Sequence, residues 1–262
     1  LGPVAVLVLE WGATRRRLVS VLGGALVAIA MLGLGQAFAL FGYVDVLCAA
    51  FVVTGAVALT FRPTDRATVG LAGCALAAAG MTKAEGAVFA LVVLGVHLVH
   101  RHDRWRTVSA LALLVVIPSL AWRSIVFGIN PHPASEIDVG NVVEVVRFSG
   151  MRMRRLCRAA GHLLRYSPPL VAASVVALLT GRVARSKPGY RRAGVLMIAA
   201  WATMFALAMI YAAGDTDLGY WLRTSAERIV TTPVLLALVA TAECVLTLVD
   251  PRVAASRAGR ST

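Results

Sequence analysis

Charged residues are scarce in this chain of 262 residues: they make up 15% of it, against 59% that are hydrophobic. Several apolar runs approach the roughly 20 residues that a membrane-spanning helix needs. No stretch between them is long enough for a separate soluble core. The composition therefore predicts an all-α integral membrane protein and excludes an ordinary soluble domain.

Short motifs of several enzyme and metal-site classes are also missing. The chain has no Gly-x-Ser-x-Gly, phosphate-binding loop or HExxH pattern. Its four cysteines have no CxxC spacing, which indicates neither a zinc site nor a disulfide framework. We expect no metal and no cofactor. A divalent ion at Asp215 and Asp217 is the alternative, and it rests on a lone DxD pattern.

Acidic residues are half as numerous as basic ones, which gives a formal net charge of +13. The basic residues lie between the apolar runs and not in one patch, which is the topology signal of a membrane protein. This distribution argues against nucleic acid as a partner. The partner that it predicts is the lipid bilayer.

The apolar runs predict about eight transmembrane helices, some of them short or interrupted. They cover residues 18–33, 44–61, 67–81, 86–99, 107–126, 168–181, 193–212 and 232–249. We expect one multi-pass domain over residues 1–250 and a basic cytoplasmic tail over residues 251–262. Leu1–Leu9 resembles the end of a helix whose beginning is missing, so we expect the domain to be N-terminally incomplete.

Most of the 26 basic residues fall in one set of alternating connections. The positive-inside rule places that set, and the C-terminus, in the cytoplasm. The loop 127–167 then faces outward and carries a predicted amphipathic helix, about residues 141–165. Its apolar residues recur at steps of three and four, with arginines on another side. Such a helix lies in the membrane interface, where it adheres to anionic headgroups or grips a lipid phosphate.

The most informative segment is a polar hexapeptide, Met81-Thr82-Lys83-Ala84-Glu85-Gly86, inside an otherwise apolar stretch. Lys83 is one of only two lysines in the chain. Charges inside a membrane segment are costly, and they often mark a site for an ion or a polar substrate. The apolar stretch is too long for one spanning helix, so we expect two short helices with the hexapeptide at their joint.

Two segments fit the capping-box pattern, in which Thr begins a helix and Glu follows three residues later. They are Thr82-Lys83-Ala84-Glu85 and Thr224-Ser225-Ala226-Glu227. A helix N-terminus attracts anions, and cations accompany both boxes: Lys83 in the first, and Arg223 and Arg228 around the second. We expect both boxes on the outward side, where they would suit a phosphate. The alternative is that they only begin helices, with Lys83 and Glu85 paired to each other.

Three pieces occur in order along the chain. Phe41-Gly42-Tyr43-Val44-Asp45 opens an apolar run, the hexapeptide follows, and Thr224-Ser225-Ala226-Glu227-Arg228 precedes the last run. In these pieces the chain resembles bacterial polytopic glycosyltransferases of the GT-C type, including relatives of the protein O-mannosyltransferases. A GYxD helix start, a TK(N)EG turn and a TSxDR segment recur in that family. The resemblance covers about Leu18 to Asp250.

The resemblance implies sugar transfer from a polyprenyl-phosphate-linked donor to an acceptor on the outer face of a bacterial plasma membrane. Lys83 and Arg228 would contact the donor phosphate, and Tyr43, Asp45 and Glu85 would line the cavity. Ala84 and Glu227 replace the more usual Asn and Asp. The family's presumed catalytic acid lies in an earlier outward loop, so no catalytic residue is identified here. A secondary transporter and a non-catalytic membrane remnant are the alternatives.

Overall fold

A computed structural model describes residues 44–62, 64–129, 145, 150–184, 188–214 and 217–249. These residues form helices and no strands. The helices are α3 (Val44–Phe61), α4 (Arg66–Thr82), α5 (Ala84–His100), a 3-10 turn η1 (His102–Arg104), α6 (Trp105–Ile129), α8 (Gly150–Arg165), α9 (Pro168–Ala184), α10 (Pro188–Ala213), α11 (Leu218–Ile229) and α12 (Thr231–Val249). The all-α prediction is therefore confirmed over the described residues.

Seven of the eight predicted apolar runs coincide with these helices, and the run 18–33 lies outside the described residues. Within the described ranges, three helical segments are long and apolar enough to cross a bilayer: His102–Ile125, Gly189–Ala213 and Thr231–Leu248. The count becomes four if the bent pair of α8 and α9 forms one span. This is compatible with a membrane protein but gives fewer full-length spans than expected. At about 1.5 Å per residue, the 17 residues of α4 or of α5 fall short of the roughly 30 Å hydrocarbon core.

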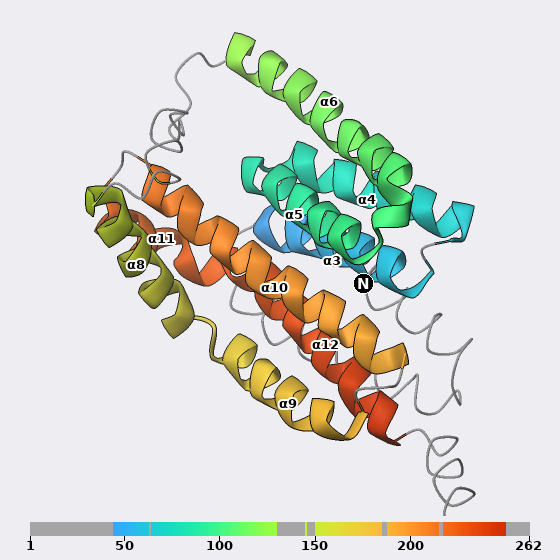
Figure 1. The fold of residues 1–262 in the computed structure, drawn as a ribbon. Helices are drawn as coiled ribbons and strands as arrows, with labels where there is room; N and C mark the ends of the chain where they lie inside the picture. The colour runs from blue at the N-terminus through green and yellow to red at the C-terminus, as the bar shows by residue number, and fades with distance from the viewer. Residues whose placement is uncertain are drawn as a thin grey trace, which may run out of the picture.

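The helices pack in two adjoining groups around α3 and α5. In one, α4 and α6 cover one side of α3 and α5, and α6 lies at the edge of the molecule (Figure 1). In the other, α10 and α12 lie side by side, with α9 along α12 and α8 against α10. Since α3 and α5 contact both groups, the described helices share one packed body.

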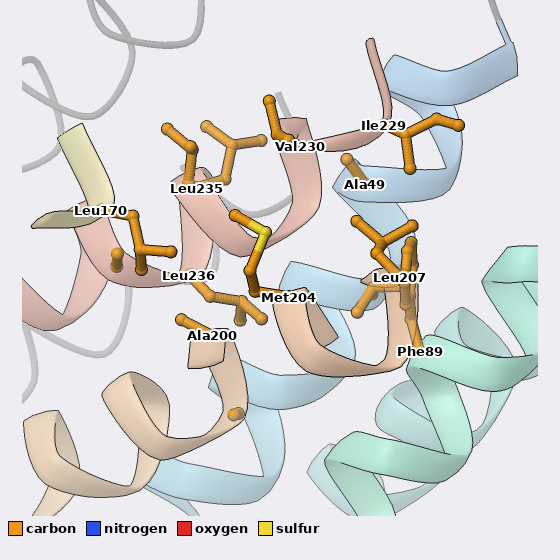
Figure 2. Close-up of a cluster of buried hydrophobic side chains, with 14 of the residues drawn as sticks. Ala49, Phe89, Leu170, Ala200, Met204, Leu207, Ile229, Val230, Leu235 and Leu236 are labelled. Atoms are coloured by element: carbon orange, nitrogen blue, oxygen red, sulfur yellow. The ribbon is translucent and has the colours of Figure 1, made fainter. Parts of the chain in front are cut away.

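The largest buried cluster lies between α10, α12 and their neighbours. Figure 2 shows Leu207 of α10 close to Phe89 of α5, and Leu236 of α12 close to Ala200 of α10. Small residues let other helices approach closely, as they do in membrane bundles. At Gly55 of α3, a Cβ atom would lie 2.5 Å from the Leu76 side chain of α4. This packing holds the beginning of α3, the joint of α4 and α5, and the beginning of α12 near one another.

Candidate functional site

The chain breaks its helix at Lys83, between α4 and α5. Lys83 has an extended backbone, with φ −156° and ψ 151°, and it is both the last cap of α4 and the first cap of α5. Its N–H group donates to the carbonyl of Ala79 at 3.3 Å, and its carbonyl accepts from the N–H of Gly86 at 3.1 Å. The prediction of two short helices joined at the hexapeptide is confirmed.

Gly86 allows this joint to be compact. A Cβ atom there would lie 2.1 Å from the Ala79 carbonyl oxygen and 2.7 Å from the Cys48 sulfur, distances that no side chain tolerates. The first turn of α5 therefore packs directly on the end of α4 and on α3. As a result, the side chains of Asp45 on α3 and Lys83 at the joint come within bonding distance.

Lys83 forms ion pairs with two carboxylates. Its Nζ lies 2.5 Å from Oδ1 of Asp45, 38 residues earlier in the chain, and 3.8 Å from Oε1 of Glu85. The side chains of Lys83, Asp45 and Glu85 are 31%, 10% and 19% exposed. The three predicted residues thus meet in one partly buried cluster, with Asp45 as the closer partner. Two carboxylates and one ammonium give these side chains a formal charge of −1, so an anionic ligand needs further positive charge from elsewhere.

An open recess lies beside this cluster. The recess is small: its volume is about 10 Å³, which is room for about one water molecule. Residues of α3, of the α4–α5 joint and of the α11–α12 junction line it: Asp45, Cys48, Lys83, Glu85, Phe89, Ile229 and Thr232. Charged and polar side chains therefore share the lining of this recess with the apolar Phe89 and Ile229.

Both predicted capping boxes are wrong. Thr82 is the last residue of α4, and its hydroxyl donates backward to the Ala79 carbonyl at 2.7 Å. Lys83, not Thr82, caps α5, and it does so without a side-chain hydrogen bond. The segment Thr224–Glu227 lies inside α11. The pattern misleads because Thr and Glu three residues apart also fit the surface of a continuing helix.

The beginning of α11 is capped by Asp217 instead. Its two carboxylate oxygens accept from the N–H groups of Gly219 at 3.1 Å and Tyr220 at 3.2 Å. This satisfies backbone donors that a helix start leaves unpaired. Asp215, the other half of the DxD pattern, lies outside the described residues. Within the described ranges, no group of three or more His, Cys, Asp or Glu side chains is placed to hold a metal ion.

The remaining predicted site residues have no described side chain. Tyr43 lies outside the described residues. Arg223 and Arg228 fall on α11, but their side chains lie outside the description. The backbone still places their segment: Ile229, the residue after Arg228, lines the same recess as Lys83. Three segments that are far apart in the sequence therefore border one hollow.

Two polar contacts were missed by the sequence reasoning. The Tyr211 hydroxyl of α10 and the Ser225 hydroxyl of α11 lie 2.5 Å apart and are buried. Arg192 of α10 donates through Nε and Nη2 to Oε1 of Glu243 on α12, at 3.1 and 2.8 Å. The second contact had a visible signal, because Glu243 is a lone acid in the apolar run 232–249. The Tyr211–Ser225 contact had no such signal in the sequence, since Tyr and Ser residues also occur in many other structural roles.

Comparison with protein-family models, with curated proteins and with solved structures found no match for this chain.

Proposed function

We propose that this chain is the membrane part of a glycosyltransferase that uses a polyprenyl-phosphate-linked sugar, and that the recess at Lys83 belongs to its donor site. One observation carries the proposal. Two of the three sequence pieces on which the GT-C resemblance rests contribute Asp45 and Lys83 with Glu85 to the same hollow, and the third piece ends at Arg228, directly before the lining residue Ile229. If the likeness of these three short motifs to the family were accidental, there would be no reason for them to lie at one recess.

The chemistry of sugar transfer suits this arrangement. The departing lipid phosphate gains negative charge in the transition state, so fixed cations nearby lower the barrier. Asp45 holds the Lys83 ammonium at the recess, and α11, which ends at the recess, carries Arg223 and Arg228 in its sequence. The added arginines would turn the formal charge of the site positive. Glu85, the more distant partner of Lys83, has acceptor capacity left for sugar hydroxyls.

The proposal includes a location. The recess would open at the outer face of a bacterial plasma membrane, where lipid-linked sugars are consumed, and the multi-pass chain would end in the cytoplasm. A lining that combines the charged cluster with the apolar Phe89 and Ile229 fits the boundary between hydrocarbon and headgroups. The isoprenoid tail would lie in the bilayer and the phosphate at Lys83.

Binding of a polyprenyl-phosphate sugar to the purified chain in lipid nanodiscs tests the proposal. We expect Lys83→Ala to weaken binding by at least about tenfold, the effect of losing one charge-assisted contact of ~1.4 kcal/mol. Arg191→Ala is the matched control, because Arg191 is an exposed cation beside Arg192. Its position is away from the recess. The neighbouring Arg192 pairs with Glu243, which lies 11 residues beyond the recess residue Thr232 on α12, or about 16 Å along that helix.

Both variants must first show the unfolding temperature of the parent. Unchanged donor affinity in Lys83→Ala, with the fold intact, rejects the donor site. Equal loss in both variants would mean that the lipid responds to overall charge, and it would reject the assignment of the recess as well.

Secondary transport is a second candidate, favoured by the two helix breaks that border the recess, at Lys83 and between α11 and α12. Broken helices also form transport sites. Replacing all four cysteines, including Cys48 of the recess, with Ser and then Lys83 with Cys would give one reporter thiol, placed at the recess. Reaction with an impermeant maleimide from one membrane side only supports the enzyme, whereas reaction from both sides supports alternating access.

A further inference from the structure

Helix α8 carries five arginines and no acid, and the structure divides these arginines between two faces. Leu156, Ala159 and Leu163 are buried against the rest of the protein, which confirms the predicted amphipathic helix over residues 150–165. Residues 141–144 and 146–149 of that prediction lie outside the described residues. The two sets of arginines have different partners.

The first set, Arg152 and Arg155, turns toward the protein. Arg152 donates to the carbonyl of Ala212 at 3.3 Å, and Arg155 donates to the carbonyl of Gly214 at 2.6 Å. These carbonyls belong to the C-terminal end of α10, where unpaired carbonyls and the helix dipole favour cations. The contacts fix the beginning of α8 at the C-terminal end of α10, one of the helices long and apolar enough to cross a bilayer.

A sharp bend then sets the direction of α8. The chain turns by 81° between α8 and α9, at Tyr166 and Ser167. Beyond the bend, α9 packs along α12 (Figure 1). It exposes apolar side chains, among them Val175, Leu178 and Leu179. An exposed apolar helix beside a spanning helix belongs in hydrocarbon. The bend sets α8 at a steep angle to α9, and α8 packs against α10, beginning beside its C-terminal end (Figure 1).

The second set, Arg154, Arg158 and Arg165, is exposed. At 100° per residue these three positions lie within about 40° of one another, on the side opposite Leu156, Ala159 and Leu163. None of the three forms an ion pair with a described residue. We propose that this face, Arg154–Arg158–Arg165, binds the headgroups of anionic lipids and holds α8 at the bilayer surface. The proposal is independent of the glycosyltransferase function.

Charge and position select this partner over an acidic protein. Three guanidinium groups that form no ion pair with a described residue, on a helix that begins at the end of a helix long enough to span a bilayer, can meet phosphate-bearing headgroups directly, and Arg binds phosphate in a bidentate manner. Each basic residue near an anionic surface adds to the attraction, which fades within a Debye length. Exposed apolar side chains on the same helix, Met151 and Leu164, can enter the acyl boundary beside the arginines.

Cys157 provides a local reporter, since it is exposed on α8 and only Cys74 is also exposed among the cysteines. In Cys74→Ser protein, a dye on Cys157 would be placed in bilayers that contain a quencher on the headgroup of either phosphatidylglycerol or phosphatidylcholine. We expect the phosphatidylglycerol quencher to be more effective by roughly twofold or more, and the preference to shrink as salt rises.

The variant Arg154→Gln/Arg158→Gln/Arg165→Gln should bring the quenching ratio to one. The matched control, Arg66→Gln/Arg101→Gln/Arg106→Gln, removes the same charge from exposed positions elsewhere and should keep the parent ratio. A ratio of one in the parent overturns the proposal and leaves the arginines for an acidic protein. An equal fall in both triple variants also overturns it, because the preference would then reflect net charge.

Discussion

Two ion pairs lie near α12, one beside its beginning and one in its second half, and they differ in the burial of their carboxylates and in their hydrogen bonding. At the beginning of α12, Lys83, Asp45 and Glu85 border an open recess, and the lysine is 31% exposed. Toward its end, Glu243 is completely buried and Arg192 bonds it through two nitrogens. One site has spare carboxylate beside a small recess, whereas the other is filled.

The Arg192–Glu243 pair, which we call the closed pair, is also packed on an aromatic ring. The Arg192 guanidinium lies 4.8 Å from the ring of Phe61 on α3, so it links α10, α12 and α3. A planar guanidinium can pair and stack at once, which an ammonium does less well. The comparison indicates that arginine was used where three helices must be fixed. Lys83, one of the two lysines of the chain, stands at the recess.

The largest effect should come from breaking the closed pair. Glu243→Leu leaves the Arg192 cation without its carboxylate in a largely buried place, which costs about 3 kcal/mol at the lower end of such losses. Unfolding of the purified protein in mixed micelles of increasing SDS measures the change. The double variant Arg192→Met/Glu243→Leu should recover most of the loss, because apolar replacements of buried pairs are often neutral. If the double variant is as unstable as the single one, the pair has a role beyond charge compensation.

The next largest effect concerns the backbone at Gly86, beside the cluster of Lys83, Asp45 and Glu85. Gly86→Ala forces a methyl group against the Ala79 carbonyl, so the beginning of α5 must move and a loss of ~1–3 kcal/mol is expected. Gly95→Ala is the matched control on the same helix, since no atom lies within 4 Å of its added Cβ. The control should be neutral or stabilise by about 0.5–1 kcal/mol through helix propensity.

Measured in the same SDS series, Gly86→Ala should be clearly less stable than Gly95→Ala. It should also lower donor affinity, if the recess is the donor site, because Lys83 and Asp45 would separate. Equal stability of the two alanine variants would mean that α4 and α5 do not meet at Gly86 as the structure places them.

A smaller effect separates the two carboxylates of the open cluster. Asp45→Asn removes the partner at 2.5 Å, whereas Glu85→Gln removes the partner at 3.8 Å. We expect Asp45→Asn to lower the free energy of unfolding by about 1 kcal/mol more than Glu85→Gln does, because Asp45 is closer to Lys83 and less exposed than Glu85. SDS unfolding of both variants, with Lys83→Gln as the common reference, measures the difference. The reverse order would identify Glu85 as the main partner of Lys83.

The sequence predicted the helices better than their ends. Apolar runs located seven of the described helices, of which only three are long and apolar enough to cross a bilayer on their own. The scarcity of lysine directed attention to Lys83, because charge inside a bilayer is costly. The capping boxes failed because a spacing of three fits a helix interior as well as its beginning. Asp217 began α11 seven residues before the predicted cap at Thr224.

The meeting of Asp45 with Lys83 was expected from a resemblance, not from local pattern. Their contact depends on how closely α3 and α5 approach, and this is set by Gly86, whose role no single-sequence signal announces. Similarly, the composition of α8 predicted an interfacial helix, but not which arginines turn inward. That division required the end of α10 to be in place, at Ala212 and Gly214.

The smallest effect is expected at the exposed start of α4, the opposite end of this helix from the joint at Lys83. Asp65 caps α4, and its carboxylate accepts hydrogen bonds from the hydroxyl and, at 2.9 Å, the N–H of Thr68. These bonds to the side chain and backbone of Thr68 hold the pKa of Asp65 below its usual value of 3.8. A lowered folded-state pKa means that the stabilisation is complete above pH 3.8 and is lost as the pH falls through the folded value. Asp65→Asn should therefore differ from the parent in melting temperature at pH 7 and should approach it near pH 2. A difference that persists unchanged at low pH would show that the cap acts through geometry alone and not through its charge.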